Sequence, residues 1–231
     1  MPEQAQVMVV TAHPDDAEFG AAGTVAHWVR EGKNVVYVAC TSGEKGTSDL
    51  TLKSDDLADI REREQVTAAK LLGVKDVIFL HFPDQGLEDT SEFRKEIVRQ
   101  IRIYRPETVV VSDPYRRYVW HRDHRIAGQV TLDAIFPFAR DHLAYPELLT
   151  EGLLPHKVRE VLLWATEEPN YYSDITDTFI IKIAALRCHH SQLGDDQFPV
   201  IEKWVKERAK KTAVGKGFEM AEAFHREEIW W

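Results

Sequence analysis

The sequence has few cysteines, no long apolar run and no leader-like N-terminus. Its two cysteines, Cys40 and Cys188, do not form a CxxC pair, so we expect two buried, reduced thiols rather than a disulfide framework. No run of about 18 apolar residues occurs, which argues against a membrane-spanning helix. The N-terminal residues MPEQAQVMVV contain no basic segment ahead of a long apolar one, so we predict no signal peptide. Together these absences predict a cytoplasmic protein without membrane partners.

Concentrated positive charge is also lacking. The 231 residues carry a formal net charge of −9, and 44% of them are hydrophobic, which is ample material for a folded core. The most basic stretch, Lys206 to Lys216, is interpreted as a solvated helix face and its exit. We therefore expect no nucleic-acid partner.

Short apolar, β-branched runs alternate with longer helical patterns along the chain. This order predicts an α/β fold, a Rossmann-like three-layer sandwich with a mostly parallel central sheet. We expect a single domain over 1–231, with a core at 6–193 and a C-terminal helical extension at 194–231. The predicted strands are 7–11, 34–40, 76–81, 107–112 and 160–165, with 175–183 as a further candidate. The predicted helices are 17–31, 54–72, 91–104, 121–136, 184–190 and 197–211.

Polar clusters follow four of the predicted strands. They are HPDDAE after the first, TSGEKG after the second, HFPDQG after the third, and SDP leading to HRDH after the fourth. Because ligands bind at the carboxyl ends of parallel strands, we expect these four loops to converge on one rim of the sheet.

Two of these clusters contain the residue types of a metal site. Adjacent carboxylates beside an imidazole, as in His13-Pro14-Asp15-Asp16, are costly unless a cation neutralises them. In the second cluster, His121 and His124 are three residues apart on a predicted helix and can face one point. Each cluster alone has a plain structural explanation as a helix start with solvated side chains. Their placement at neighbouring strand ends favours a shared ion instead.

A catalytic zinc site needs three protein ligands and an open position for water. His13, Asp16 and His124 can supply the three ligands, and Asp15 then becomes the general base for the water. His121 remains free, with Asp123 available to fix its tautomer and keep it charged. The ligand set suits Zn²⁺ and is also compatible with Fe²⁺ or Co²⁺.

The sequence AHPDDAE with HRDH downstream resembles the PIG-L/LmbE-type N-acetylglucosamine deacetylases. Weaker similarities extend it over residues 6–193, including Arg61-x-x-Glu64, Pro83 to Gly86 and His189-x-Ser191-Gln192. The resemblance implies zinc on His13, Asp16 and His124, and Asp15 as the base. It further implies that His121 with Asp123 assists as acid or oxyanion stabiliser, and that Arg61 lies near the substrate.

The function that this resemblance implies is removal of the N-acetyl group from a substrate containing N-acetylglucosamine. An amidase acting on a larger amino-sugar conjugate is one alternative, and a metal-binding protein without catalysis is another. A phosphoacceptor domain would explain an acidic pair after the first strand, with Asp84 as acceptor, but not HRDH. We expect a homo-oligomer, in which Trp230 and Trp231 dock on their own domain or on a neighbouring subunit.

Overall fold

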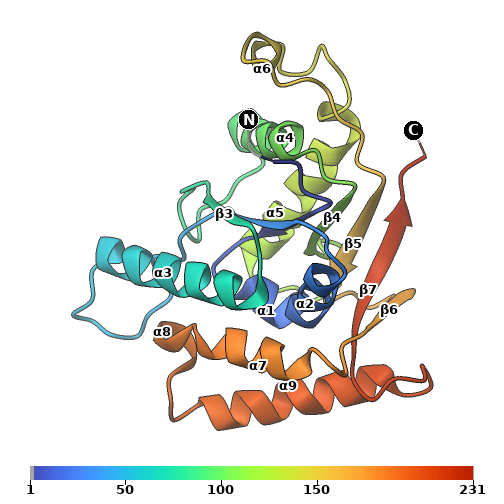
Figure 1. The fold of residues 1–231 in the computed structure, drawn as a ribbon. Coiled ribbons are helices and arrows are strands. Elements are labelled where there is room, and N and C mark those ends of the chain that lie inside the picture. Colours follow the sequence, from blue (N-terminus) through green and yellow to red (C-terminus); the bar gives the residue numbers. More distant parts are fainter. Residues whose placement is uncertain (1–2, 231) are drawn as a thin grey trace.

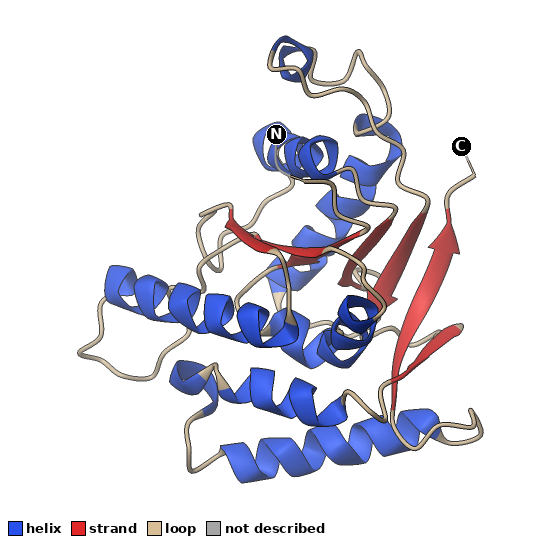
Figure 2. Ribbon diagram, viewed as in Figure 1, coloured by secondary structure: helices blue, strands red, loops and turns tan. Residues whose placement is uncertain are grey.

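A seven-stranded sheet with helices on both faces forms the molecule, as the computed structural model of residues 3–230 shows (Figures 1 and 2). The strand order is β3-β2-β1-β4-β5-β7-β6, and the first five strands of this order run parallel. The predicted Rossmann-like, mostly parallel architecture is therefore confirmed. The strands are β1 (Val7–Thr11), β2 (Val35–Ala39), β3 (Asp76–Phe79), β4 (Thr108–Ser112), β5 (Glu160–Trp164), β6 (Tyr171–Asp174) and β7 (Ala221–Glu228).

The helices form two layers around this sheet, and a further helix packs outside one of them (Figure 1). One layer contains α2, α3 and α7, and the opposite layer contains α4 and α5. The helices are α1 (Asp16–Gly20), α2 (Ala22–Arg30), α3 (Ser54–Leu72), α4 (Ser91–Tyr104), α5 (Arg122–Asp133), the π-helix η1 (Ala134–Phe138), α6 (Glu147–Thr150), α7 (Phe179–Arg187), α8 (His190–Leu193) and α9 (Phe198–Ala213).

The central strands are apolar on both faces because helices cover both. Every residue of β1, β2 and β4 is buried. Alternate side chains of β1 enter different cores: Met8 and Val10 pack on the α4 side, and Val7 and Val9 pack on the α2 side. Burial of both faces explains why these strands are continuous apolar runs rather than alternating ones.

Strand β1 lies at the point where the strand order reverses. It pairs with β2 on one side and with β4 on the other, both in parallel. The connections from β1 and β4 leave in opposite directions, so a crevice opens between the loops that follow these two strands. The two clusters proposed to bind a metal, HPDDAE and HRDH, are in those loops.

The C-terminal part differs from the prediction. The segment 175–183 is not a strand, because β6 ends at Asp174 and α7 begins at Phe179. The extension 194–231 is helical only through α9 and then contributes β7, which pairs antiparallel with both β5 and β6. The extension therefore completes the sheet. A smaller difference is that the predicted helix 17–31 is interrupted at Ala21.

A buried ion pair joins β7 to the helices beside it. Lys182 Nζ lies 2.6 Å from Glu222 Oε1, and both side chains are almost fully buried. Lys182 also donates to the Phe19 carbonyl, while Glu222 accepts from the backbone N–H groups of Gly23 and Thr24. The pair ties the last strand to α7 and to the start of α2.

Lys182→Met should lower the free energy of unfolding by about 3 kcal/mol, because it leaves Glu222 as a buried charge without its cation. Urea unfolding followed by circular dichroism measures the change. Lys203→Met is the matched control: its ammonium is exposed and lies 4.0 Å from Glu207, so its loss should cost at most about 1 kcal/mol. Equal effects of the two substitutions would contradict a structural role for the buried pair.

No helix within residues 3–230 combines the length and apolar composition of a membrane span. Trp230 is 80% exposed, so it does not dock on its own domain. Trp231 lies outside the described residues, and the homo-oligomer stays a prediction.

Candidate metal centre

The loop after β1 presents its polar residues through an unusual backbone conformation. Asp15 has φ 91°, in the left-handed region that most residues avoid. This turn starts α1 at Asp16, whose Oδ2 accepts a hydrogen bond of 2.9 Å from the His13 backbone N–H. The loop therefore directs the Asp16 side chain toward His124 and the Asp15 side chain toward Arg61.

The first turn of α5 supplies the second group. His121 is the residue before the helix, and its Nδ1 accepts the Asp123 N–H at 3.2 Å. Since Nδ1 is an acceptor, the neutral ring carries its proton on Nε2. His124 lies one turn along the helix, and its backbone carbonyl accepts from the Ser112 hydroxyl at the end of β4.

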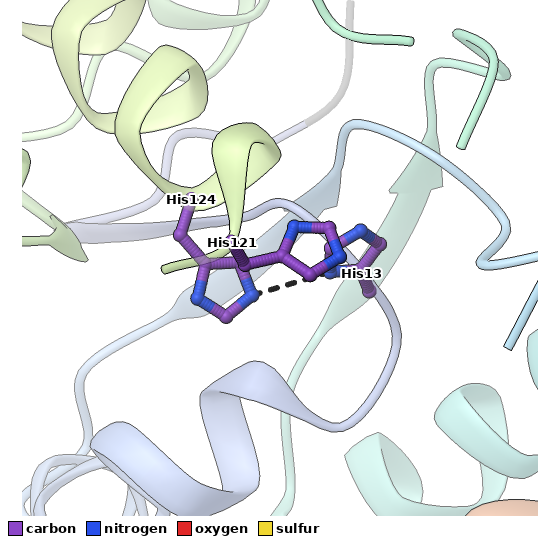
Figure 3. A group of neighbouring side chains, drawn as sticks. All are labelled: His13, His121 and His124. Atoms are coloured by element: carbon purple, nitrogen blue, oxygen red, sulfur yellow. Dashed lines mark hydrogen bonds between the residues drawn. The ribbon is translucent and has the colours of Figure 1, made fainter. Parts of the chain in front are cut away.

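Three candidate ligand residues, His13, Asp16 and His124, converge between these loops, and Figure 3 shows the two imidazoles. His124 Nε2 lies 3.3 Å from His13 Nδ1 and 3.2 Å from Asp16 Oδ1, and Asp16 Oδ2 lies 3.6 Å from His13 Nδ1. Tetrahedral ligands at about 2.0–2.2 Å from a zinc ion are roughly 3.3–3.6 Å from one another. The spacing of these atoms therefore fits one zinc-sized cation.

A third imidazole joins the group from the solvent side. Nitrogen atoms of His13, His121 and His124 all lie within 4.8 Å of one another, and the His121 and His124 rings are stacked. His121 is exposed, whereas His13 is buried. His121 is thus the imidazole best placed to meet a bound molecule.

Two carboxylates face the other nitrogen of His13. His13 Nε2 lies 3.1 Å from Asp84 Oδ1 and 3.2 Å from Asp123 Oδ2. Burial lowers the pKa of His13, but hydrogen bonds to Asp123, Asp16 and Asp84 outweigh it and raise the pKa to about 11. Carboxylates in this position orient a metal-binding histidine and increase its basicity. Asp84, which follows β3, is a site residue that the sequence analysis did not assign.

The predicted partnership of Asp123 with His121 stays a prediction: the Asp123 backbone N–H holds the His121 tautomer, and a carboxylate oxygen of Asp123 lies within 4.8 Å of a His121 ring nitrogen without a hydrogen bond between them. The Asp123 carboxylate is fully buried and contacts His13 and the N–H groups of Gln85 and Leu87. Burial and the nearby charges of His13 and His124 lower the pKa of His121. This lowered pKa favours the neutral imidazole in the metal-free protein, and the expected charged form stays a prediction.

Asp15 is held away from the ligand group by α3. Its N–H donates to Gln65 Oε1, and its Oδ2 accepts from Arg61 at 3.2 Å. Burial and the charge of Asp16 raise the pKa of Asp15 to about 7, against the opposing effect of Arg61. A carboxylate with a pKa near neutrality can both accept and return a proton.

Arg61 is buried beneath Asp15. Its guanidinium donates to the carbonyls of Gly43 and Pro14 as well as to Asp15. A Cβ at Gly43 would lie 2.3 Å from Arg61 Nη1, so the glycine makes room for this side chain. These contacts assign Arg61 to positioning Asp15, and direct substrate binding by Arg61 stays a prediction.

Comparison with known proteins agrees with this geometry. The family model for PIG-L, GlcNAc-PI de-N-acetylase, matches residues 8–135, which is more than half of the chain. The chain belongs to the PIG-L family. Within the matched region lie all the residues that converge on the candidate ion.

Among its relatives, the PIG-L chain is 36% identical to a diacetylchitobiose deacetylase of Thermococcus kodakarensis, over 87% of this chain and 75% of that protein. The structure of N,N'-diacetylchitobiose deacetylase from Pyrococcus horikoshii superposes with a TM-score of 0.92 at 33% identity, covering 97% of this chain and 84% of that one. A mycothiol S-conjugate amidase of Streptomyces coelicolor is 34% identical over 64% of this chain and 57% of that protein.

A second buried pair in this PIG-L chain connects α1 to the C-terminal region. Glu18 and His189 are fully buried, and His189 Nε2 lies 3.0 Å from Glu18 Oε2. Gln65 donates to the same carboxylate, and Ser191 hydrogen bonds to Glu64 on α3. The sequence analysis identified the His-x-Ser-Gln motif, but the partner of His189 lies 171 positions away in the sequence. The motif fixes the C-terminal segment against α1, which follows Asp15, and against α3, which carries Arg61.

Proposed function

We propose that this chain is a zinc-dependent hydrolase that removes the acetyl group from an N-acetylglucosamine-containing substrate. The observation that carries the proposal is the convergence of His13 Nδ1, Asp16 and His124 Nε2 at ligand spacing. Family membership and similarity to diacetylchitobiose deacetylases support the amino-sugar substrate.

The residues present suit the proposed ion. Two imidazoles and one carboxylate form a ligand set typical of zinc hydrolases, and they also accept Fe²⁺ or Co²⁺. His13 donates from Nε2 toward Asp84 and Asp123, which leaves the lone pair of Nδ1 directed at Asp16 and His124. When bound, zinc supplies a Lewis acid for the acetyl carbonyl and makes a water acidic enough to lose its proton near neutral pH.

Asp15 takes the proton from the attacking water. Its pKa of about 7 allows this at neutral pH, and Arg61 with Gln65 holds the carboxylate in place. His121 presents Nε2–H to the oxygen of the acetyl group as negative charge develops there. A neutral imidazole with its proton on Nε2 can donate a hydrogen bond to this oxygen without transferring the proton.

The proton that returns to the amine nitrogen comes from Asp15. The family resemblance also allows His121 to act as this acid. The lowered pKa of His121 and the pKa of about 7 of Asp15 favour Asp15 in both steps. One carboxylate then transfers the proton from water to the leaving amine as the amide C–N bond breaks, releasing acetate.

A second candidate is an amidase acting on a larger amino-sugar conjugate. It is supported by the 34% identity to a mycothiol S-conjugate amidase. The same residues would carry out the same amide hydrolysis, and only the acyl group and the sugar substituents would differ.

An acetate-release assay tests the proposed function. Metal-free protein and protein reloaded with zinc are each given N-acetylglucosamine, its β-1,4-linked dimer and its glycosides. We expect acetate release only from the reloaded protein, since the ion supplies the Lewis acid. An acylated thiol conjugate of glucosamine distinguishes the amidase. Equal acetate release with and without metal, or release from none of the sugars, would refute the proposal.

A further inference from the structure

The candidate metal centre opens into a cavity on the side of the C-terminal helix. The cavity has a volume of about 680 Å³ and includes Asp16 and His124 in its wall. It reaches α9 and the strand pair β6–β7, so residues far apart in the sequence form it. A cavity of this size accommodates a small-molecule ligand larger than one acetamido group.

Five cationic side chains line this cavity, and one of them, Lys182, is paired with Glu222. The other four come from two regions of the chain. Arg116 comes from the loop after β4, Arg208 and Lys211 come from α9, and Lys216 follows that helix. Within residues 3–230, no carboxylate oxygen lies within 4.0 Å of any of these four cations. The chain has a net charge of −9, yet it places these four cations around one cavity. In residues 3–230, none of the four has a carboxylate at ion-pair distance.

The carboxylates of the cavity wall are already engaged. Asp16 faces His13 and His124, and Glu222 is paired with Lys182. The cavity therefore has a positive potential beside the candidate metal site, and low-dielectric walls strengthen such a potential.

Helix α9 directs only part of its charge into the cavity. Arg208 and Lys211 lie in the wall, three residues apart on one face, with Trp204 four residues before Arg208. Lys206 and Lys210 on the same helix are exposed and do not line the cavity. All of these basic side chains are exposed, as the interpretation of 206–216 as a solvated face expects, and Arg208, Lys211 and Lys216 differ from the others in facing the cavity.

Two of the inward cations influence each other. Burial and the positive charge of Arg116 lower the pKa of Arg208. Lys216 Nζ lies 3.7 Å from the centre of the Tyr172 ring, which holds that ammonium at the cavity wall. Cations that line one cavity without carboxylate partners favour a bound anion, and guanidinium groups suit phosphate and carboxylate oxygens in particular.

We propose that the substrate of this enzyme carries an anionic group, phosphate or carboxylate, on its N-acetylglucosamine unit, and that Arg116 and Arg208 bind this group. This inference rests on the proposed deacetylation. The acetamido group lies at the Asp16–His124 end of the cavity, and the anion lies at the α9 end. Arg116 and Arg208 determine which sugar is deacetylated and take no part in breaking the amide bond.

Matched substrates test the proposal. Zinc-loaded protein is assayed with the neutral methyl glycoside of N-acetylglucosamine, with its 1-phosphate and 6-phosphate, and with a glycoside of a hydroxy acid. We expect kcat/KM at least about tenfold higher for one of the anionic sugars, mainly through KM, because charge-assisted hydrogen bonds strengthen binding. The arms distinguish a phosphate from a carboxylate, and added salt should reduce the advantage.

Variants locate the anion site. Arg116→Gln and Arg208→Gln should each reduce the ratio of anionic to neutral kcat/KM toward one. Arg117→Gln and Lys210→Gln are matched controls, since both residues are exposed and neither lines the cavity, and they should keep the ratio. Calorimetry of the preferred anionic sugar on metal-free protein gives a second measurement that is independent of turnover. Its affinity should fall in the same two variants.

Three outcomes separate the two hypotheses. If the protein deacetylates the neutral glycoside and shows no preference for any anionic sugar, the anion site is overturned and the proposed function stands. A preference that survives in both arginine variants also overturns the anion site. Acetate release from none of the sugars refutes the proposed function, and tighter binding of anionic sugar by the native metal-free protein would still support the anion site.

Discussion

Asp15→Asn should lower kcat by about 10²–10⁴-fold, the usual contribution of a general base, while the protein keeps its metal. The substitution removes the proton acceptor and leaves the three proposed ligands His13, Asp16 and His124 unchanged. Steady-state kinetics with elemental analysis of the same samples measures both quantities.

Asparagine is the appropriate replacement because of the backbone at this position. Asp15 has φ 91°, and Asn adopts the left-handed region more readily than alanine does. Its side-chain oxygen can also accept the hydrogen bond from Arg61 that Asp15 Oδ2 accepts now. The fall in kcat then reports the lost base rather than a distorted loop.

Asp56→Asn is the control for a carboxylate lost elsewhere. Asp56 is exposed in the first turn of α3, five residues before the buried Arg61, and its replacement should leave kcat unchanged. If Asp15→Asn kept more than a tenth of native kcat with full metal content, Asp15 would not be the base. His121 would then be the first group to re-examine.

The elements with strong local patterns were predicted with their observed bounds. β1, α3 and α4 begin and end at the predicted residues, and Gly73 ends α3 with φ 79°. The α7 region was not predictable in this way. Its residues FIIKIAALR are apolar around most of the helix because α2, α3 and α9 surround it, and a short apolar run does not distinguish helix from strand.

Contacts between side chains that are far apart in the sequence were also not predicted. The sequence showed that His13, Asp16 and His124 belong to adjacent strand ends, because topology alone brings those loops together. It did not show that the Asp123 carboxylate hydrogen-bonds to His13, or that Glu18 is buried against His189. β7 was missed for a similar reason: AEAFHREE is polar, and its strand conformation comes from pairing with β5 and β6.

His13→Ala should abolish both metal binding and turnover, because the variant keeps only two of the three proposed ligands. Zinc affinity should fall by at least about a hundredfold, the upper range seen on losing even an outer partner of a metal ligand. His27→Ala is the matched control, since His27 is half-exposed on α2 and contacts Glu31 instead. Competition with a chelator of known zinc affinity measures each variant.

The native protein should bind zinc at least about tenfold more tightly for each unit that the pH rises between 6 and 8, since metal must displace a proton. The pKa of His13 in the metal-free protein is raised to about 11, despite burial, by Asp123, Asp16 and Asp84. The ring is therefore protonated across this range, and each bound ion releases at least one proton. The pKa of His124, raised chiefly by the charge of Asp16, adds to the slope at the acidic end.

The same proton has the opposite effect on the metal-free fold. A histidine whose folded pKa lies above its unfolded value near 6.5 stabilises fully below that value and loses this contribution as the pH rises through about 11. Zinc binding strengthens over the same interval, so the rise in Tm on adding a fixed excess of zinc should be larger at pH 8 than at pH 6. An affinity independent of pH would mean that His13 holds no proton for the ion to displace. In that case Asp84 and Asp123 would not raise the pKa of the proposed ligand His13.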